Sequence, residues 1–199
     1  MEPLPIVYPI TFTFDSPQEI ARWRPLVAWL LVIPQAIVAG VISWVAGICA
    51  VAAWFIVLVT GKLPEGLAGV ISLGLRYQAR VGVYAMFLKE EYPPFAFDTV
   101  PGDPGDDPRI KVDVQPQLED RNRLTVLFRG ILTFPHLLML AAMGIAVSVV
   151  LFIALFAVLF TGKWPEGMRN FVVGYLRWNA RAMGYYYLLT DEWPPIALD

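Results

Sequence analysis

The chain has 199 residues, of which 57% are hydrophobic and 16% are charged, and its formal net charge is −2. Soluble domains usually carry about 25% charged residues, so the composition is typical of an integral membrane protein. A slightly acidic chain without a sustained basic stripe gives no reason to expect a nucleic-acid partner. The single cysteine, Cys49, excludes an intramolecular disulfide and a cysteine-based zinc site.

The first predicted elements are a short strand and a long apolar segment. The stretch YPITFTFD at 8–15 alternates apolar and polar residues, which is typical of a strand. Between Arg24 and Lys62 there is no Asp, Glu, Lys or Arg, and an apolar run of about 18 residues or more is a transmembrane candidate. Proline suits the first turn of a helix and disrupts its interior. We therefore place a short interfacial helix before Pro34 and a spanning helix from about Pro34 to Val59. One long helix kinked at the proline and a re-entrant hairpin are the alternatives.

The phrase TGKLPEG at 60–66 ends this span. Its threonine and lysine can reach polar headgroups, while its glycine and proline turn the chain. A membrane-edge turn is therefore predicted here. The phrase recurs as TGKWPEG at 161–167, where a second membrane-edge turn is predicted. The residues predicted to form the two turns are Thr60, Gly61, Lys62, Pro64, Thr161, Gly162, Lys163 and Pro165.

The helix that follows, from about Leu67 to Leu88, is largely apolar but carries Arg76 and Arg80 on one face, since residues four apart are neighbours on a helix. An arginine at the bilayer centre costs about 2.5–3.5 kcal/mol on insertion scales, so each of these side chains needs polar partners. Three arrangements remain open: the helix crosses with its arginines turned inward, it lies in the interface, or it crosses and draws headgroups or water inward. The arginines predicted to bind anionic lipid or another anion are Arg76, Arg80, Arg169, Arg177 and Arg181.

After this helix the chain reads EYPPFAFD and then TVPGDPGDDPR. Proline, glycine and aspartate favour turns and solvated chain, so 99–109 is predicted to be an acidic linker. The next stretch, RIKVDVQ, again alternates and predicts a second short strand. We expect opening and closing stretches of the repeats to pair as a small sheet, with extended tails on the membrane surface as the alternative.

The second half of the chain repeats the first at a constant offset of 101 positions, from Arg22 over Arg123 onward. TGKLPEG falls on TGKWPEG, LRYQAR on LRWNAR, and EYPPFAFD on EWPPIALD. Duplication is the simplest explanation. It divides the chain into a membrane repeat at 1–98, the linker at 99–109 and a second membrane repeat at 110–199. The same division at the proline predicts a spanning helix from about Pro135 to Phe160 in repeat two.

These elements predict an all-α membrane protein built as a tandem repeat of helical hairpins, with about four transmembrane helices and short strands at the repeat ends. If the arginine-bearing helices do not cross, each repeat has one span. Lysines and arginines cluster on the side of the termini and linker in the four-span arrangement. The positive-inside tendency then places that side in the cytoplasm.

The motifs LRWNAR, TGKWPEG and EWPP resemble the bacterial membrane family of unknown function numbered 4389. In that family an apolar segment containing Pro-His leads to a TGK/R-x-P-x-G turn, a helix with an LRW-x-x-R core and a Tyr/Trp-Pro-Pro end. Repeat two matches this pattern, including Pro135 and His136, whereas repeat one has Gln35 for the histidine and Tyr77 for the tryptophan. The resemblance covers nearly the whole chain. It implies a protein of the bacterial inner membrane and implies no catalytic residue.

The sequence contains few candidate catalytic residues. The only histidine, His136, has no neighbouring Asp or Ser for a triad, and no His, Cys, Asp or Glu cluster has metal-ligand spacing. We expect no enzyme and no cofactor, but a structural or accessory subunit or scaffold. It would pack against a membrane complex or a second copy and bind anionic lipid. The alternative is a small oligomeric transporter or channel for an anionic species.

Overall fold

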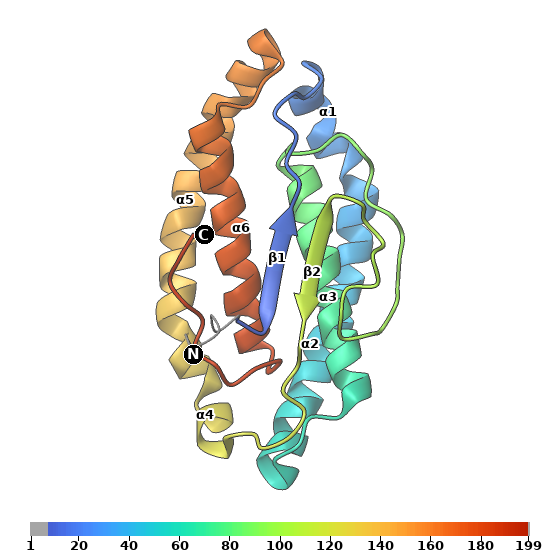
Figure 1. Cartoon of the computed structure of the whole chain (residues 1–199), viewed down its shortest axis with the longest axis vertical. Coiled ribbons are helices and arrows are strands. Elements are labelled where there is room, and N and C mark those ends of the chain that lie inside the picture. Colours follow the sequence, from blue (N-terminus) through green and yellow to red (C-terminus); the bar gives the residue numbers. More distant parts are fainter. Residues whose placement is uncertain (1–7, 199) are drawn as a thin grey trace, which may run out of the picture.

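A computed structural model describes residues 8–198 (Figure 1). The first repeat contributes a strand, a short helix, a long helix and a second helix. These are β1 (Ile10–Phe14), α1 (Arg24–Leu31), α2 (Ile33–Thr60) and α3 (Glu65–Ala85). The second repeat contributes the same series, β2 (Ile110–Val114), α4 (Arg123–Leu127), α5 (Arg129–Thr161) and α6 (Glu166–Tyr186). Residues 1–7, at the start of the predicted first repeat, and residue 199 lie outside the described part.

The two repeats are interlaced around α3 and α6, which pack against each other in the middle of the molecule. β1 packs on α6 of the other repeat, and β2 packs on α3. The two strands pair antiparallel, from Ile10 opposite Val114 to Phe14 opposite Ile110 (Figure 1). The two strands predicted at the opening stretches are therefore present, whereas the closing stretches form no strand in the described residues. The expected pairing of opening with closing stretches is wrong, because the two opening stretches pair with each other.

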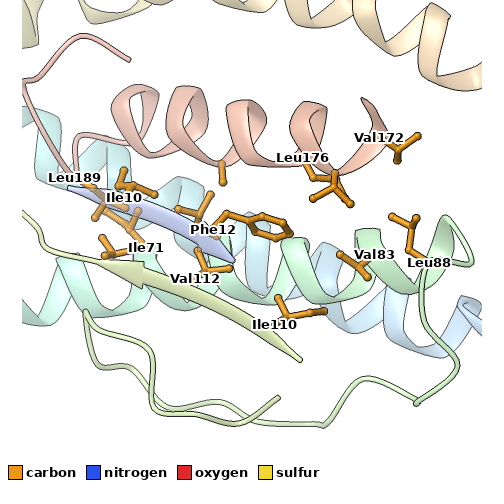
Figure 2. Packing of buried hydrophobic residues seen from close by; sticks show 14 of the residues in the cluster. Ile10, Phe12, Ile71, Val83, Leu88, Ile110, Val112, Val172, Leu176 and Leu189 are labelled. Atoms are coloured by element: carbon orange, nitrogen blue, oxygen red, sulfur yellow. The ribbon is translucent and has the colours of Figure 1, made fainter. Parts of the chain in front are cut away.

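Strand alternation explains this arrangement. Ile10 and Phe12 on β1 and Val112 on β2 are buried, whereas Thr13, which follows Phe12, and Lys111, which precedes Val112, are exposed. One side of the sheet is thus apolar and must cover another apolar surface. Figure 2 shows these side chains directed at α3 and α6, where they join the main core.

α2 and α5 lie outside this centre, α2 against α3 and α5 against α6. Within the described residues neither long helix contacts a strand. The stripe that α2 buries consists mostly of small residues, which allow close helix contact. Its members include Ala39, Ala46, Ala50, Ala53 and Val57. The other sides of both long helices stay apolar and exposed.

The predicted start of the spanning helix is correct in repeat one and wrong in repeat two. In repeat one α1 ends at Leu31 and α2 begins at Ile33, so Pro34 lies in the first turn. In repeat two α5 already begins at Arg129 and continues through Pro135. Side-chain contacts of Arg129, described below, fix that earlier start, and the proline falls in the helix interior.

Only α2 and α5, among the helices of the described chain, are long and apolar enough to cross a membrane. The expectation of about four transmembrane helices is therefore not confirmed for α3 and α6. Both of these helices are largely buried in the protein and carry a lower share of apolar residues. What the structure supports is a mostly helical tandem repeat with a small sheet and two candidate spans.

Gly69 on α3 allows the linker to lie directly on this helix. A Cβ at Gly69 would be 2.0 Å from the carbonyl oxygen of Thr99, far inside van der Waals contact. We expect Gly69→Ala to push the linker away and to lower the free energy of unfolding by about 1–3 kcal/mol. Gly66→Ala is the matched control, because an added Cβ there meets nothing within 4 Å. That control should be neutral or stabilising by up to about 1 kcal/mol. Equal thermal unfolding of both variants would contradict this close approach.

Candidate functional site

Arg76 is the most heavily engaged of the predicted lipid-binding arginines. Its Nη1 donates to the carbonyl oxygens of Val100, Pro101 and Gly102 at 2.6, 3.0 and 2.8 Å, and its Nη2 donates to that of Asp98 at 2.6 Å. The residue is only 2% exposed. Burial lowers the pKa of this guanidinium, and the charge of Asp103 opposes the shift. The four carbonyls supply the hydrogen-bond acceptors that a buried cation needs.

The second arginine of the motif binds the closing tail in the same way in both repeats. Arg80 Nη2 donates to the Ala96 carbonyl and Arg181 Nη2 to the Ala197 carbonyl, both at 3.4 Å. Arg80 also pairs with Asp106 of the linker, with 3.0 Å between Nη1 and Oδ2. The shared bond explains why LRYQAR and LRWNAR both end in arginine.

The remaining two arginines hold other extended segments. Arg177 donates from Nε to the Phe12 carbonyl on β1 at 3.2 Å and from Nη1 to the Leu198 carbonyl at 3.1 Å. Arg169 donates to the Ser16 carbonyl at 3.2 Å. All five predicted arginines thus contact the polar layer of strands, linker and tails. Binding of anionic lipid by these residues stays a prediction.

The linker does not behave as freely solvated chain. Asp107 forms an ion pair with Lys89, and each side chain is 1% exposed. Asp107 also accepts hydrogen bonds from the backbone N–H groups of Arg109 and Ile110. The second half of 99–109 is therefore anchored by a buried ion pair and by Arg80, which the acidic, turn-rich composition did not predict.

The duplicated TGK-x-P-E-G phrase joins the two repeats. Gly61 and Gly162, both at φ 73°, end α2 and α5 in the left-handed conformation that suits glycine. The Gly61 carbonyl accepts from the N–H of Arg121 at 3.2 Å, and the Gly162 carbonyl from that of Ile20 at 2.9 Å. Each turn is therefore bonded to the segment that precedes the short helix of the other repeat.

Side chains and neighbouring backbone of the phrase extend this contact. Lys62 pairs with Glu119 at 2.8 Å and Lys163 with Glu19 at 3.0 Å. The hydroxyls of Thr60 and Thr161 each donate to the carbonyl four residues earlier and accept the N–H of the following lysine. Pro64 and Pro165 stand immediately before α3 and α6. A turn at each predicted position is present, and its location at a membrane edge stays a prediction.

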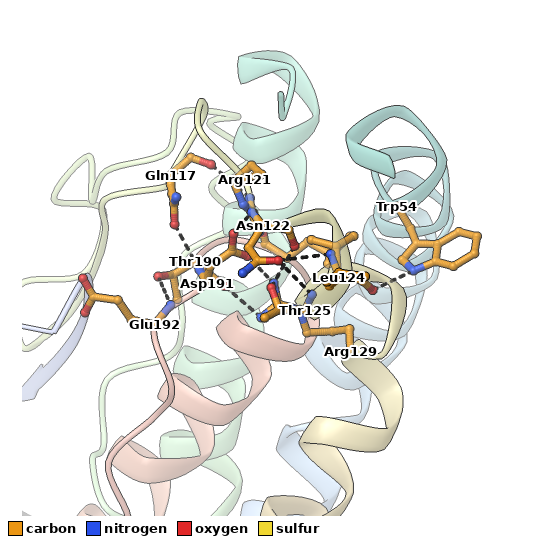
Figure 3. A network of polar contacts seen from close by, with 12 residues as sticks. Trp54, Gln117, Arg121, Asn122, Leu124, Thr125, Arg129, Thr190, Asp191 and Glu192 are labelled. Atoms are coloured by element: carbon orange, nitrogen blue, oxygen red, sulfur yellow. Dashed lines mark hydrogen bonds and ion pairs between the residues drawn. The ribbon is translucent and has the colours of Figure 1, made fainter. Parts of the chain in front are cut away.

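Asp191 is the centre of a charged network that sequence reasoning did not find (Figure 3). Its Oδ1 accepts from Arg121 Nη2 at 2.7 Å and also from Arg129 Nη2, and its Oδ2 accepts from the Asn122 N–H at 2.8 Å. Arg129 also lies over the ring of Tyr185, 4.0 Å from its centroid. Burial alone would raise the pKa of Asp191. The hydrogen bond and charge of Arg121 outweigh it and hold the pKa below its ordinary value.

The 101-residue offset could have revealed part of this network. It places Asp191 over Glu90 and Asn122 over Ala21, and Glu90 indeed accepts a hydrogen bond from the Ala21 N–H. The two carboxylates therefore perform the same backbone contact in the two repeats. The arginine partners exist only in repeat two, so only the backbone contact follows from the repeat.

His136 is fully buried, between the rings of Trp178 and Trp193 at centroid distances of 6.0 and 4.7 Å. In repeat one the equivalent position is Gln35, which donates to the Pro93 carbonyl and accepts from the Tyr77 hydroxyl. In both repeats this position joins the long helix to the second helix and to the closing tail. Across residues 8–198 no three His, Cys, Asp or Glu side chains are grouped so that they could hold a metal ion.

The outer sides of α2 and α5 form a second feature, here called the apolar face. Trp44 is 72% exposed, Ile145 71% and Phe160 71%. The hydroxyls of Ser43 and Ser148 donate to carbonyls of their own helices, four residues earlier. An open groove of about 940 Å³ lies between α2, the first turn of α5 and the end of α6, and its surface is mostly apolar.

The fold and these contacts define a two-repeat helical protein in which arginines fix a layer of extended chain and two long apolar helices remain exposed. A family described as a domain of unknown function, DUF4389, matches residues 22–96 and again residues 123–197. The chain belongs to this family and contains two tandem copies of its domain. No curated protein and no solved structure matches the chain.

Proposed function

We propose that this protein is a non-catalytic membrane scaffold. Its two long apolar helices sit in lipid, while its sheet, linker and tails form a fixed polar surface for another membrane subunit. The observation that supports this is the apolar face. A helix on the surface of a water-soluble protein carries a polar side, whereas α2 and α5 expose large apolar side chains along their length. Large exposed apolar patches are typical of membrane or protein contact sites.

The polar surface supports a scaffold better than an anion transporter. The arginines that would bind a transported anion donate to backbone carbonyls or to Asp106. Such contacts hold the linker and tails in one arrangement, and a rigid surface lowers the entropic cost of binding a partner. Lipid binding by the same arginines is a weaker part of the proposal, since they already have protein partners.

Membrane fractionation tests the first half of this function. We expect the full-length protein to stay with membranes after high-salt and alkaline carbonate washes, and to require detergent for release. Recovery in the soluble fraction as a monodisperse species would overturn the proposal. A second copy packed face to face would bury the same apolar side chains and produce that soluble result.

Native mass spectrometry after mild extraction tests the second half. A different membrane protein bound at fixed stoichiometry supports the scaffold. Copurified lipid alone would mean that the polar surface binds no other subunit, and this result counts against the scaffold. A closed oligomer of this chain alone that conducts anions in liposomes would replace the scaffold with the transporter.

A further inference from the structure

We propose that the apolar face lies flat in a single leaflet, so that neither α2 nor α5 crosses the bilayer. This inference rests on the proposed membrane function and specifies its geometry. The surface is formed by α2 and α5, and the partner is the hydrocarbon of one leaflet. The sheet, linker and both turns then lie on the same side of the membrane.

The position of the sheet is the first argument. β1 and β2 lie alongside the middle of the long axis of the molecule, parallel to the helices (Figure 1). If α2 and α5 stood upright, the strands and the exposed Lys111 would sit near the depth of the bilayer centre. Each strand pairs with only one other strand, and charged side chains bind the outer edges, Arg177 at the Phe12 carbonyl and Asp103 at the Val112 N–H. Such sheet edges and the charges that cover them are not tolerated at the centre of the hydrocarbon. With the molecule flat, the sheet faces water.

The direction and length of the helices are the second argument. α2 and α5 run in opposite directions, with the α2–α3 turn and the α5–α6 turn at opposite ends of the molecule (Figure 1). α2 has 28 residues and α5 has 33, which correspond to about 42 and 50 Å of helix. The hydrocarbon core is only about 30 Å thick, so upright helices would have to tilt or protrude. A helix that lies in the plane has no such limit.

The border of the apolar face is the third argument. The closing tail of repeat one receives a hydrogen bond from Gln35 on α2 at Pro93 and one from Arg80 on α3 at Ala96. It therefore runs along the boundary between the long helix and the polar layer. Exposed aromatic side chains occur on this tail and on its counterpart in repeat two, as expected at the headgroup level. They include Tyr92, Phe95, Phe97 and Trp193.

The apolar face also suits contact with lipid at atomic detail. Its serines bond within their own helices, so the backbone and hydroxyl groups of the surface need no water. The open groove beside α2 is lined by side chains such as Trp44, Ile48 and Phe55 and has room for acyl chains. Arg76 and Arg80 on α3 and Arg181 on α6 bind the linker and the closing tails. They therefore lie next to the polar layer, where water and headgroups lower the cost of their charge.

Cysteine accessibility tests the orientation. Lys62 and Lys163 mark the two opposite ends of the molecule, and their side chains are 65% and 59% exposed. Each would be changed to cysteine in a Cys49→Val background, because Val150 occupies the equivalent position in repeat two. Exposed ion pairs contribute little stability, so Lys62→Cys and Lys163→Cys should fold. A third variant, Lys111→Cys, reports on the middle of the molecule.

A membrane-impermeant maleimide is then added to sealed vesicles of either orientation. We expect all three cysteines to react in the same vesicle orientation and to be protected in the other. Reaction of the Lys62 and Lys163 variants from opposite sides, or an unreactive Lys111 variant in both orientations, would overturn flat insertion. Either of these results overturns flat insertion but not the proposed scaffold function. Loss of the protein from the membrane fraction, in contrast, would overturn the scaffold function.

Discussion

Arg76→Ala is expected to lower the free energy of unfolding by about 3 kcal/mol or more. The substitution leaves the four carbonyls that Arg76 binds, at residues 98 and 100–102, without this donor. Each buried polar group left unpaired costs about 1–3 kcal/mol, reduced where the linker can move into water. Thermal unfolding in mild detergent, followed by near-ultraviolet circular dichroism, measures the loss. Limited proteolysis should show faster cleavage within 99–109.

Arg177→Ala is the matched control, because the residue occupies the same position in repeat two. It makes two bonds, at 3.2 and 3.1 Å, and is only partly buried. We expect a loss of about 1 kcal/mol and no faster cleavage of 99–109. Arg76→Lys keeps the charge but not the planar fork, so it should fall between Arg76→Ala and the unmodified protein. Equal losses for Arg76→Ala and Arg177→Ala would mean that the linker is not held by Arg76.

Much of the fold could be predicted from the sequence because it repeats. The 101-residue offset predicts equivalent second helices, and α3 and α6 indeed begin at Glu65 and Glu166. The alternating stretches identify both strands, and the absence of charge between Arg24 and Lys62 identifies the long helix. These features depend on local side-chain patterns, which survive in a single sequence.

The partners of the arginines could not be predicted, because they are mainly backbone carbonyls. A carbonyl group has no sequence signature. The sequence therefore indicated only that Arg76 and Arg80 need polar partners. The prediction assigned that need to lipid because the segment was expected to lie in the bilayer. In the structure the linker folds back over α3 and meets it. The bonds between each TGK turn and the other repeat were hidden for the same reason.

The start of α5 also shows where local patterns fail. Pro135 and Pro34 are equivalent in sequence, and the rule for proline in a helix predicts the same break before both. The difference comes from Arg129, whose equivalent in repeat one is Ala28. Arg129 is bound by Asp191 and by the Thr190 carbonyl, contacts across more than sixty residues that no local rule contains.

Asp191→Asn is the second substitution with a large expected effect. The carboxylate pairs with Arg121 and Arg129, whose side chains are 0% and 3% exposed. Removing one partner from a buried charged network usually costs about 3–5 kcal/mol, because the remaining charges stay buried without compensation. Detergent-phase thermal unfolding should show this loss, together with fraying of the α4–α5 junction in hydrogen exchange. Glu90→Gln is the matched control. Its carboxylate makes the equivalent contact with the Ala21 N–H in repeat one and is exposed, so a loss of at most about 1 kcal/mol is expected.

The same carboxylate predicts how stability depends on pH. Because the pKa of Asp191 is lower in the folded protein than its ordinary value, the unfolded chain binds the proton more tightly. The stabilisation is fully present above the pKa of the unfolded chain, about 3.9. It is lost as the pH falls through the lower folded value. Unfolding measured from pH 7 down to acid should therefore show the gap between the unmodified protein and Asp191→Asn narrowing below about pH 4. A gap that stays constant to the lowest pH would mean that the carboxylate's charge does not hold the two arginines.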